Sequence, residues 1–157
     1  MKQAIKRNNN EPGSRRDRGV AAVELAILLP LFGILLLGIL EVGGMARDHQ
    51  VLENAAREGA RFSALSNNKM ASNPSPGTVQ TRIKDRIIAY LAKERITVAA
   101  GDIAVNQTYL MQVGGIKVFG SEITVNYARP VMFPGIARWL PLGSTTLKGR
   151  AVFRNFY

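Results

Sequence analysis

Two residues near the N-terminus have types and positions that could support chemistry at a membrane. Glu24 is the only charged residue between Val20 and Leu40, in a run that is otherwise apolar. An ionised side chain inside a bilayer costs free energy, so a carboxylate in this run calls for a reason. Gly19 lies between a basic flank and the apolar run. A residue without a side chain gives a protease cleft an extended segment to bind, so we expect processing here.

Each of these residues also has a simpler interpretation. Glu24 would lie ~6 Å along a helix from Val20, so its side chain could reach the interface and merely be tolerated there. Gly19 could be a flexible joint. Pro30 could be an ordinary membrane-helix proline or a functional bend, because lipid-embedded helices tolerate proline. Four glycines offer small surfaces for packing against another helix: Gly33, Gly38, Gly43 and Gly44.

Other kinds of active site have little support in the sequence. The chain has no cysteine and His49 is its only histidine, so a transition-metal site is not expected. Trp139 is typical of a head-domain core or interface residue. The sequence contains no phosphate-binding glycine loop and no nucleophile elbow. We therefore expect no enzymatic activity, no cofactor, no metal and no small-molecule substrate.

Acidic residues are spaced along one predicted helix instead of gathering in a pocket. We expect them to form surface salt bridges with arginines of the same helix. The acidic residues are Glu41, Asp48, Glu53 and Glu58, and the arginines are Arg47, Arg57 and Arg61.

The net charge of +10 over 157 residues bears on partners and topology. Six lysines and arginines lie in the first nineteen residues, directly before the apolar run. Positive flanks stay in the cytoplasm, so this cluster favours a topology signal over nucleic-acid binding. The N-terminus should be cytoplasmic and the remainder exported.

The pattern of apolar residues divides the chain into five parts. Residues 1–19 form a basic cytoplasmic leader, expected to be disordered up to residue 18, and residues 20–41 are long enough for a transmembrane helix. Helical spacing continues without a break through residues 42–65, which predicts an amphipathic extension of that helix. Residues 66–77 are a loop, and residues 78–157 form an exported head.

The head should combine one short helix with a small antiparallel sheet. Thr78 can cap the helix, which should end near Arg95. Its apolar stripe is Val79, Ile83, Ile87, Tyr90 and Leu91. The period then changes to two, with a Gly114-Gly115 hairpin and about three strands, the last from Thr145 to Phe156. Leu147, Ala151 and Phe153 should share one face of that strand. The predicted fold class is α+β.

The chain resembles the TadE-like pseudopilins of the bacterial tight-adherence (Tad) pilus system, a type IVc pilus. The resemblance rests on Arg18-Gly19-Val20-Ala21-Ala22-Val23-Glu24-Leu25-Ala26, on Leu29-Pro30, and on the segments 38–43 and 55–61. It is strong over residues 18–62 and diffuse in the head, where residues 123–127 also look similar. TadG-like relatives carry a much longer exported region, and a major fimbrial subunit would be far shorter.

The resemblance implies a pilin-like fold and a role as a minor subunit in assembling an adhesive pilus. It implies cleavage by a prepilin peptidase between Gly19 and Val20, and pairing of Glu24 with the free amine of Val20 on a neighbouring subunit. The implied partners are the membrane, the prepilin peptidase, the major pilin, other pseudopilins and the inner-membrane assembly platform. The rival interpretation is an unprocessed, signal-anchored exported domain with a binding or adhesin-like role.

Overall fold

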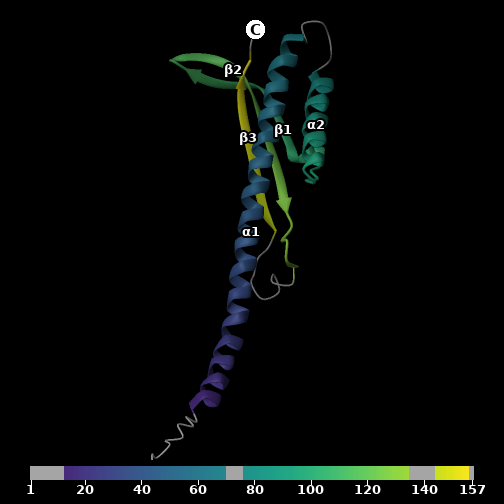
Figure 1. Cartoon of the computed structure of the whole chain (residues 1–157). Helices are drawn as coiled ribbons and strands as arrows, with labels where there is room; N and C mark the ends of the chain where they lie inside the picture. The colour runs from purple at the N-terminus through teal and green to yellow at the C-terminus, as the bar shows by residue number, and fades with distance from the viewer. Residues whose placement is uncertain (1–12, 70–75, 135–143, 156–157) are drawn as a thin grey trace, which may run out of the picture. The chain divides into compact units, whose positions relative to one another are not determined.

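The computed structural model describes residues 13–69, 76–134 and 144–155. The chain divides into two compact units, residues 1–40 and 41–157, which are described separately below. The predicted α+β class is confirmed by a long N-terminal helix, a second shorter helix and a three-stranded antiparallel sheet (Figure 1). Trp139 and Phe156 lie outside the described residues.

The first unit consists of the N-terminal part of helix α1 (Gly13–Lys69). The helix begins at Gly13, so the disorder expected up to residue 18 is wrong for residues 13–18. Once a helix has nucleated, each further residue adds a hydrogen bond, and the adjoining apolar helix supplies that nucleus for the arginine-rich stretch. Pro30 lies inside the helix without ending it.

Helix α1 continues into the second unit, the head, where it gains a buried face. Its buried apolar residues recur at helical spacing and are Leu52, Ala55, Ala56, Ala60 and Ala64. The amphipathic pattern predicted for residues 42–65 therefore has its physical cause in the head core. The helix extends to Lys69, beyond the expected start of the loop.

Helix α2 (Pro76–Lys93) covers the same core. It starts two residues before the predicted cap Thr78, because proline is well suited to the first turn, where its missing N–H is not needed. Four residues of the predicted stripe are buried, and Tyr90 is partly buried. The helix ends in a Schellman motif: Arg95 has a positive φ of 63°, and the Ile96 amide donates to the Leu91 carbonyl at 3.0 Å.

A short 3₁₀ helix, η2 (Ala100–Asp102), leads into the sheet. The strands are β1 (Ile103–Val113), β2 (Ile116–Arg129) and β3 (Thr145–Arg154), in the order β1-β2-β3. Gly114 and Gly115 both have positive φ angles, 58° and 83°, as a tight two-residue hairpin requires. The β1–β2 register shifts between Asn106 and Tyr109, which marks a bulge.

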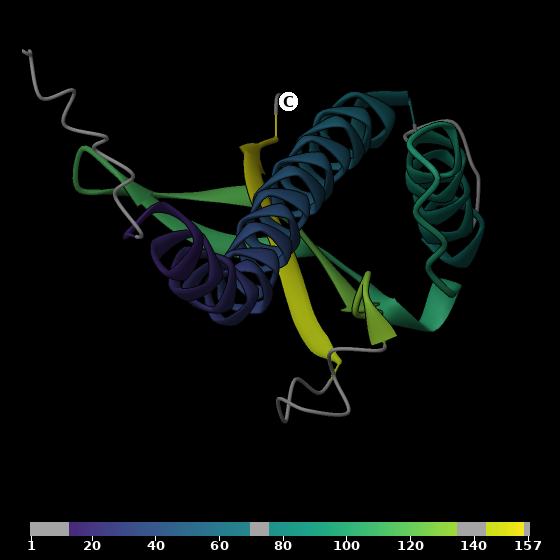
Figure 2. The ribbon, with the colours of Figure 1, turned by 60° about the horizontal axis from the view of Figure 1, so that its bottom comes forward.

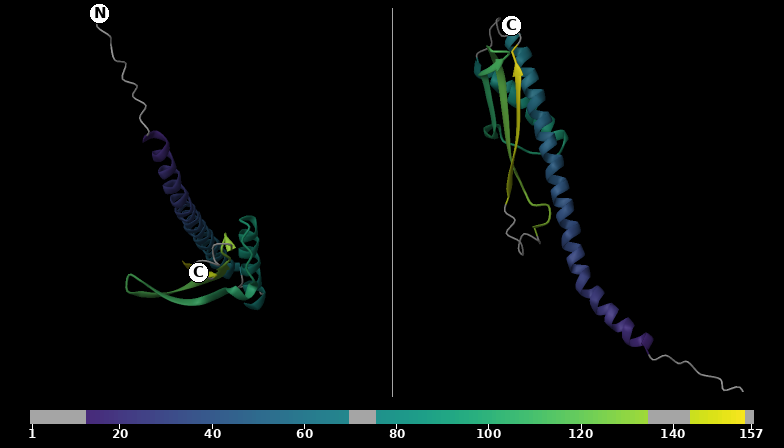
Figure 3. Two further views of the ribbon diagram at one scale, coloured as in Figure 1. Left: turned by 90° about the horizontal axis from the view of Figure 1, so that it is seen from below. Right: turned by 90° about the vertical axis from the view of Figure 1, so that its left-hand side faces the viewer.

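Two glycines bring backbone segments of the head close together. A Cβ on Gly149 of β3 would lie 2.5 Å from backbone atoms of Leu52, so the strand passes directly against α1. A Cβ on Gly59 would lie 2.5 Å from Ile87 of α2 and 3.1 Å from Ile123 of β2. The core therefore sits where α1, α2 and the sheet meet, as the successive views of Figure 2 and Figure 3 let the reader follow. Leu147, Ala151 and Phe153 lie on one face of β3, as predicted, and Phe153 is 37% exposed because it lies near the end of the strand.

Candidate functional site

The apolar segment of α1 is exposed on all sides. Between Gly19 and Leu40, only Gly33 and Leu37 are even partly covered. Among the described residues, one helical segment is long and apolar enough to cross a membrane. It is the part of α1 from Gly19 to Leu65, and its most apolar stretch has no buried residue. Water is an unfavourable solvent for so long an apolar surface, so the segment fits a lipid environment.

Glu24 lies exposed in this segment, and within the part of the chain that the structure describes it has no ion-pair partner. Gly19 and Val20 are exposed near it on the same helix. A Cβ added to Gly33, Gly38 or Gly43 would meet nothing within 4 Å, so nothing in the described chain packs on these three glycines. The structure thus leaves Gly19, Val20 and Glu24 exposed and these three glycines open to another helix, whereas Gly44 contacts other residues of the head.

A second cluster of functional groups forms in the head, where α1 begins its buried part. Arg129, the last residue of β2, is 5% exposed and reaches two carboxylates of α1. Its Nε donates to Asp48 Oδ2 at 2.8 Å, and its Nη1 donates to Glu41 Oε1. The second oxygen of Glu41, Oε2, accepts a hydrogen bond from the Met132 amide at 3.1 Å. Glu41 therefore holds both the side chain of Arg129 and the chain that follows it.

Electrostatics favour this cluster in the charged form. Burial lowers the pKa of Arg129, but the hydrogen bonds to Glu41 and Asp48 and the charges of these two groups outweigh burial, so that the pKa is raised above its ordinary value. Arginine is protonated in any case, and here its planar guanidinium matches two acceptors. The group is a permanent cation held between two carboxylates, which suits a fixed tether better than proton transfer.

Gly44 makes room for the cluster of Arg129, Glu41 and Asp48. A Cβ on Gly44 would lie 2.6 Å from Arg129 Nη2 and 3.2 Å from Met132 Cε, so any larger residue would displace the guanidinium. Glu41, Gly44 and Asp48 are spaced three and four residues apart and share one face of the helix. The sequence predicted surface salt bridges within this helix for Glu41 and Asp48. Asp48 does lie 3.9 Å from Arg47 of the same helix, but the hydrogen bonds of Asp48 and Glu41 with Arg129 were not predicted.

The other acidic residues of α1 follow the prediction only in part. Glu53 does pair with Arg57 of the same helix, at 3.1 Å. Glu58 instead accepts two hydrogen bonds from Arg86 of α2, at 2.7 and 3.0 Å, so the expectation of a partner within α1 is wrong for it. The reason is that α2 packs beside α1 and brings Arg86 within hydrogen-bond distance of Glu58.

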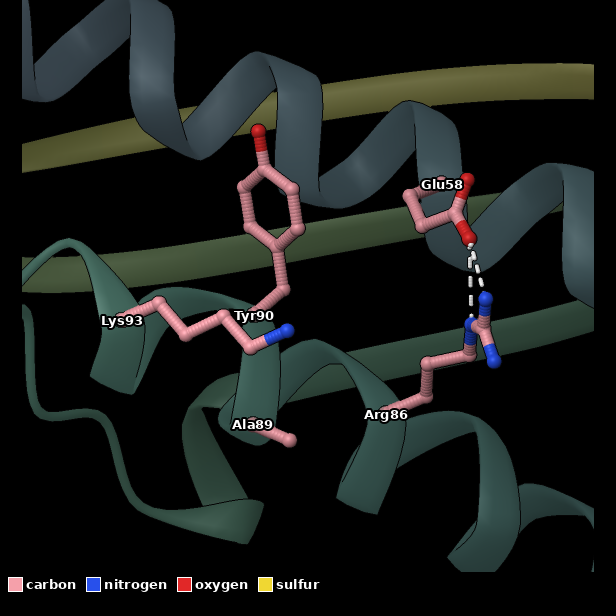
Figure 4. A pocket seen from close by; sticks show the side chains of 5 residues that line it. All are labelled: Glu58, Arg86, Ala89, Tyr90 and Lys93. Carbon is pink, nitrogen blue, oxygen red and sulfur yellow. Dashed lines mark hydrogen bonds and ion pairs between the residues drawn. The ribbon is translucent and has the colours of Figure 1, made fainter.

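Glu58 and Arg86 also line a small hollow between α1 and α2 (Figure 4). Its other lining residues are Ala89, Tyr90 and Lys93. The volume, about 190 Å³, is below the ~300–1,000 Å³ typical of ligand pockets. In Figure 4 the guanidinium of Arg86 points at the carboxylate of Glu58, so the two strongest polar groups satisfy each other. Nothing in this arrangement points to a reaction.

No group of three or more histidine, cysteine, aspartate or glutamate side chains that could hold a metal occurs among residues 13–69, 76–134 and 144–155. His49 is exposed, and its Nε2 lies 3.6 Å from Glu53 Oε1, one helical turn along α1. The site residues that remain are therefore those of the apolar helix and of the cluster formed by Arg129, Glu41 and Asp48.

Comparison with known protein families gives a match in the N-terminal part of the chain. The family model of TadE-like proteins matches residues 19–61, which begin at Gly19 and extend through Glu24, Glu41 and Asp48. No curated protein and no solved structure matches the chain. The resemblance predicted from the sequence is thus confirmed over residues 19–61, which are similar to the TadE-like family.

Proposed function

We propose that this chain is a minor, pilin-like subunit that takes part in assembling an adhesive pilus of the Tad type. Residues 20–41 anchor it in the bacterial inner membrane, with the basic N-terminus in the cytoplasm and the head outside. The observation that carries the proposal is the TadE-like match over residues 19–61, which coincides with an apolar helix that the rest of the described chain leaves uncovered. The role is structural and not enzymatic.

Processing follows from the same segment. The match begins at Gly19, the small residue between the arginine-rich flank and the apolar run. Cleavage after Gly19 by a prepilin peptidase would remove the basic leader and create a free amine on Val20. That amine would pair with Glu24 of a neighbouring subunit. The partners of the processed chain would be the major pilin, other pseudopilins and the inner-membrane assembly platform.

The free-energy cost of placing the Glu24 carboxylate in the bilayer is the reason for giving this residue a role in assembly. A carboxylate inside a bilayer is unfavourable by ~2.5–3.5 kcal/mol at the centre and by less near the edge. Pairing with the amine of Val20 on another subunit would neutralise both groups and repay that cost only after assembly. The carboxylate would thus favour the docked subunit over the free one.

The proposal is tested by the mature mass of the protein. We expect the full-length gene, expressed in the native bacterium with its assembly genes present, to yield a mature protein that begins at Val20. Gly19→Arg should block processing, because a bulky charged residue cannot enter the cleft, whereas Gly13→Arg should leave processing intact and serves as the matched control. Intact-mass spectrometry and N-terminal sequencing read both results. Wild-type protein that retains Met1 in cells making the peptidase would instead support the unprocessed, signal-anchored binding domain.

A further inference from the structure

The hairpin formed by β1 and β2 extends beyond the rest of the sheet. The last β2–β3 pair is Gly120 with Arg154, after which the Asn155 amide still donates to the Phe119 carbonyl at 3.1 Å. The remainder of the hairpin, residues 109–119, is a two-stranded structure that we call the ribbon. In Figures 1, 2 and 3 it projects away from α2. Two strands alone are only marginally stable in water, so the ribbon lacks support.

The ribbon exposes apolar side chains on both of its faces. Leu110 and Phe119 are directly opposite each other and are 58% and 52% exposed. Val113 and Ile116, opposite each other on the other face, are 50% and 69% exposed. These four exposed apolar residues gather on one two-stranded segment, which indicates an interaction site.

The two edges of the sheet differ in a way that indicates which one is meant to pair. The β3 edge carries Lys148, Arg150 and Arg154, and such charges keep an edge from pairing with another strand, even though Arg150 also bonds Glu122 at 2.6 Å. The β1 strand, Ile103–Val113, has no charged residue and no proline in eleven positions. Its bulge protects the part before Tyr109, which leaves residues 109–113 as an open, uncharged edge.

We propose that residues 109–113 of β1 pair in antiparallel fashion with the same residues of a second copy of this chain. An uncharged edge is complementary to itself, since no like charges meet when it is turned by a two-fold axis, whereas two β3 edges would bring six cations together. The two ribbons then form one four-stranded sheet. The backbone N–H and C=O groups of the open edge are then paired, and each copy contributes the same surface, as an isologous dimer requires.

The absence of cysteine from the chain makes the proposal testable by single-cysteine crosslinking. Leu110→Cys, Met111→Cys and Gln112→Cys are introduced one at a time into the full-length protein, and native membranes are treated with an oxidant. Directly opposite residues of antiparallel strands have Cα atoms ~4.5–5.5 Å apart, which a disulfide can span. Because residues 109–113 pair with the same residues in antiparallel order, Met111 lies at the two-fold axis, and we expect the strongest disulfide-linked homodimer on non-reducing gels for Met111→Cys. Lys148→Cys, on the opposite edge, is the matched control and should remain monomeric.

A second pair of variants separates strand pairing from mere proximity in the membrane. In the background of the most efficient crosslinking variant, Val113→Lys places a cation on the β1 edge, and crosslinking should be lost. Thr146→Lys adds the same charge to the β3 edge and should leave crosslinking unchanged. Crosslinking that is equal at Lys148→Cys, that survives Val113→Lys, or that joins only a different protein would overturn the assignment to a second copy. Pairing does not depend on cleavage after Gly19, so its failure is distinguishable from failure of the proposed function.

Discussion

Replacing Arg129 with methionine should destabilise the head strongly. Methionine retains much of the apolar stem but leaves two carboxylates, Glu41 and Asp48, beside each other without the cation that they share. The Glu41 and Asp48 side chains are only 16% and 15% exposed, so water can solvate them only in part. Removing one partner from a buried ion pair costs ~3–5 kcal/mol, and the residual exposure here places our expectation near the lower end, at about 3 kcal/mol.

Urea denaturation of the full-length protein in detergent micelles, followed by pulse proteolysis, measures this loss. With a slope of ~1.5 kcal/mol per molar urea, the midpoint should fall by about 2 M. Arg57→Met is the matched control, because Arg57 is 63% exposed and its pair with Glu53 connects two residues of one helix. Such a pair is worth ~0.3–0.5 kcal/mol, so the control midpoint should barely move.

Neutralising the carboxylates together with the arginine tests the reasoning itself. If the loss arises from uncompensated charge, the combination of Glu41→Gln, Asp48→Asn and Arg129→Met should be more stable than Arg129→Met alone. A triple variant as unstable as the single one would refute the electrostatic explanation and would leave lost packing as the cause. An Arg129→Met midpoint within 0.3 M of wild type, about 0.5 kcal/mol at the same slope, would refute the tether altogether.

Three further outcomes follow from other parts of the molecule. Glu24→Leu should leave membrane levels near normal and reduce piliation and co-purification with other pilins, with Glu24→Gln showing whether the charge is needed; full piliation of the leucine strain would contradict the assembly role. Gly149→Ala should destabilise the head by ~1–3 kcal/mol, because its Cβ would lie 2.5 Å from α1 backbone atoms, whereas Gly101→Ala, with open space around it, should not. Ser121→Ala removes a buried hydroxyl that accepts a hydrogen bond from Ser63 at 2.9 Å and donates one to Asn155 at 2.8 Å. Thermal unfolding should show a loss of ~1–2 kcal/mol in the free energy of unfolding, whereas Ser144→Ala, at an exposed serine, should show none.

Periodicity predicted the elements of the fold well, and their ends less well. The change from helical spacing to alternation after Gly101, together with Gly114-Gly115, is a local signal, and local signals determine hairpins and amphipathic helices. Helix ends depend on how far hydrogen bonding propagates, so α1 (Gly13–Lys69) exceeds its predicted limits at both ends.

The Arg129 cluster was not predicted, because its members lie more than eighty residues apart in the chain. One signal was nevertheless present. Ile123, Val125 and Tyr127 alternate along β2, and Arg129 is the next residue in that series. A charged residue that continues the buried face of a strand needs a buried partner. The sequence does not say which carboxylate supplies it, since that depends on how the strand lies against α1.

The use of an ion cluster instead of apolar packing at this place has a physical rationale. Well-packed hydrophobic residues often stabilise a protein as much as a buried ion pair does. At Glu41, however, an apolar residue would lengthen the uncharged run Leu25–Leu40 and shift the point at which a spanning helix could leave the bilayer. A carboxylate at Glu41 ends that run, and Arg129 allows the same carboxylate to be buried in the head. One residue can thereby fix both the end of the apolar segment and the attachment of β2. Glu41→Leu should therefore lower the stability of the head, even though the added side chain is apolar.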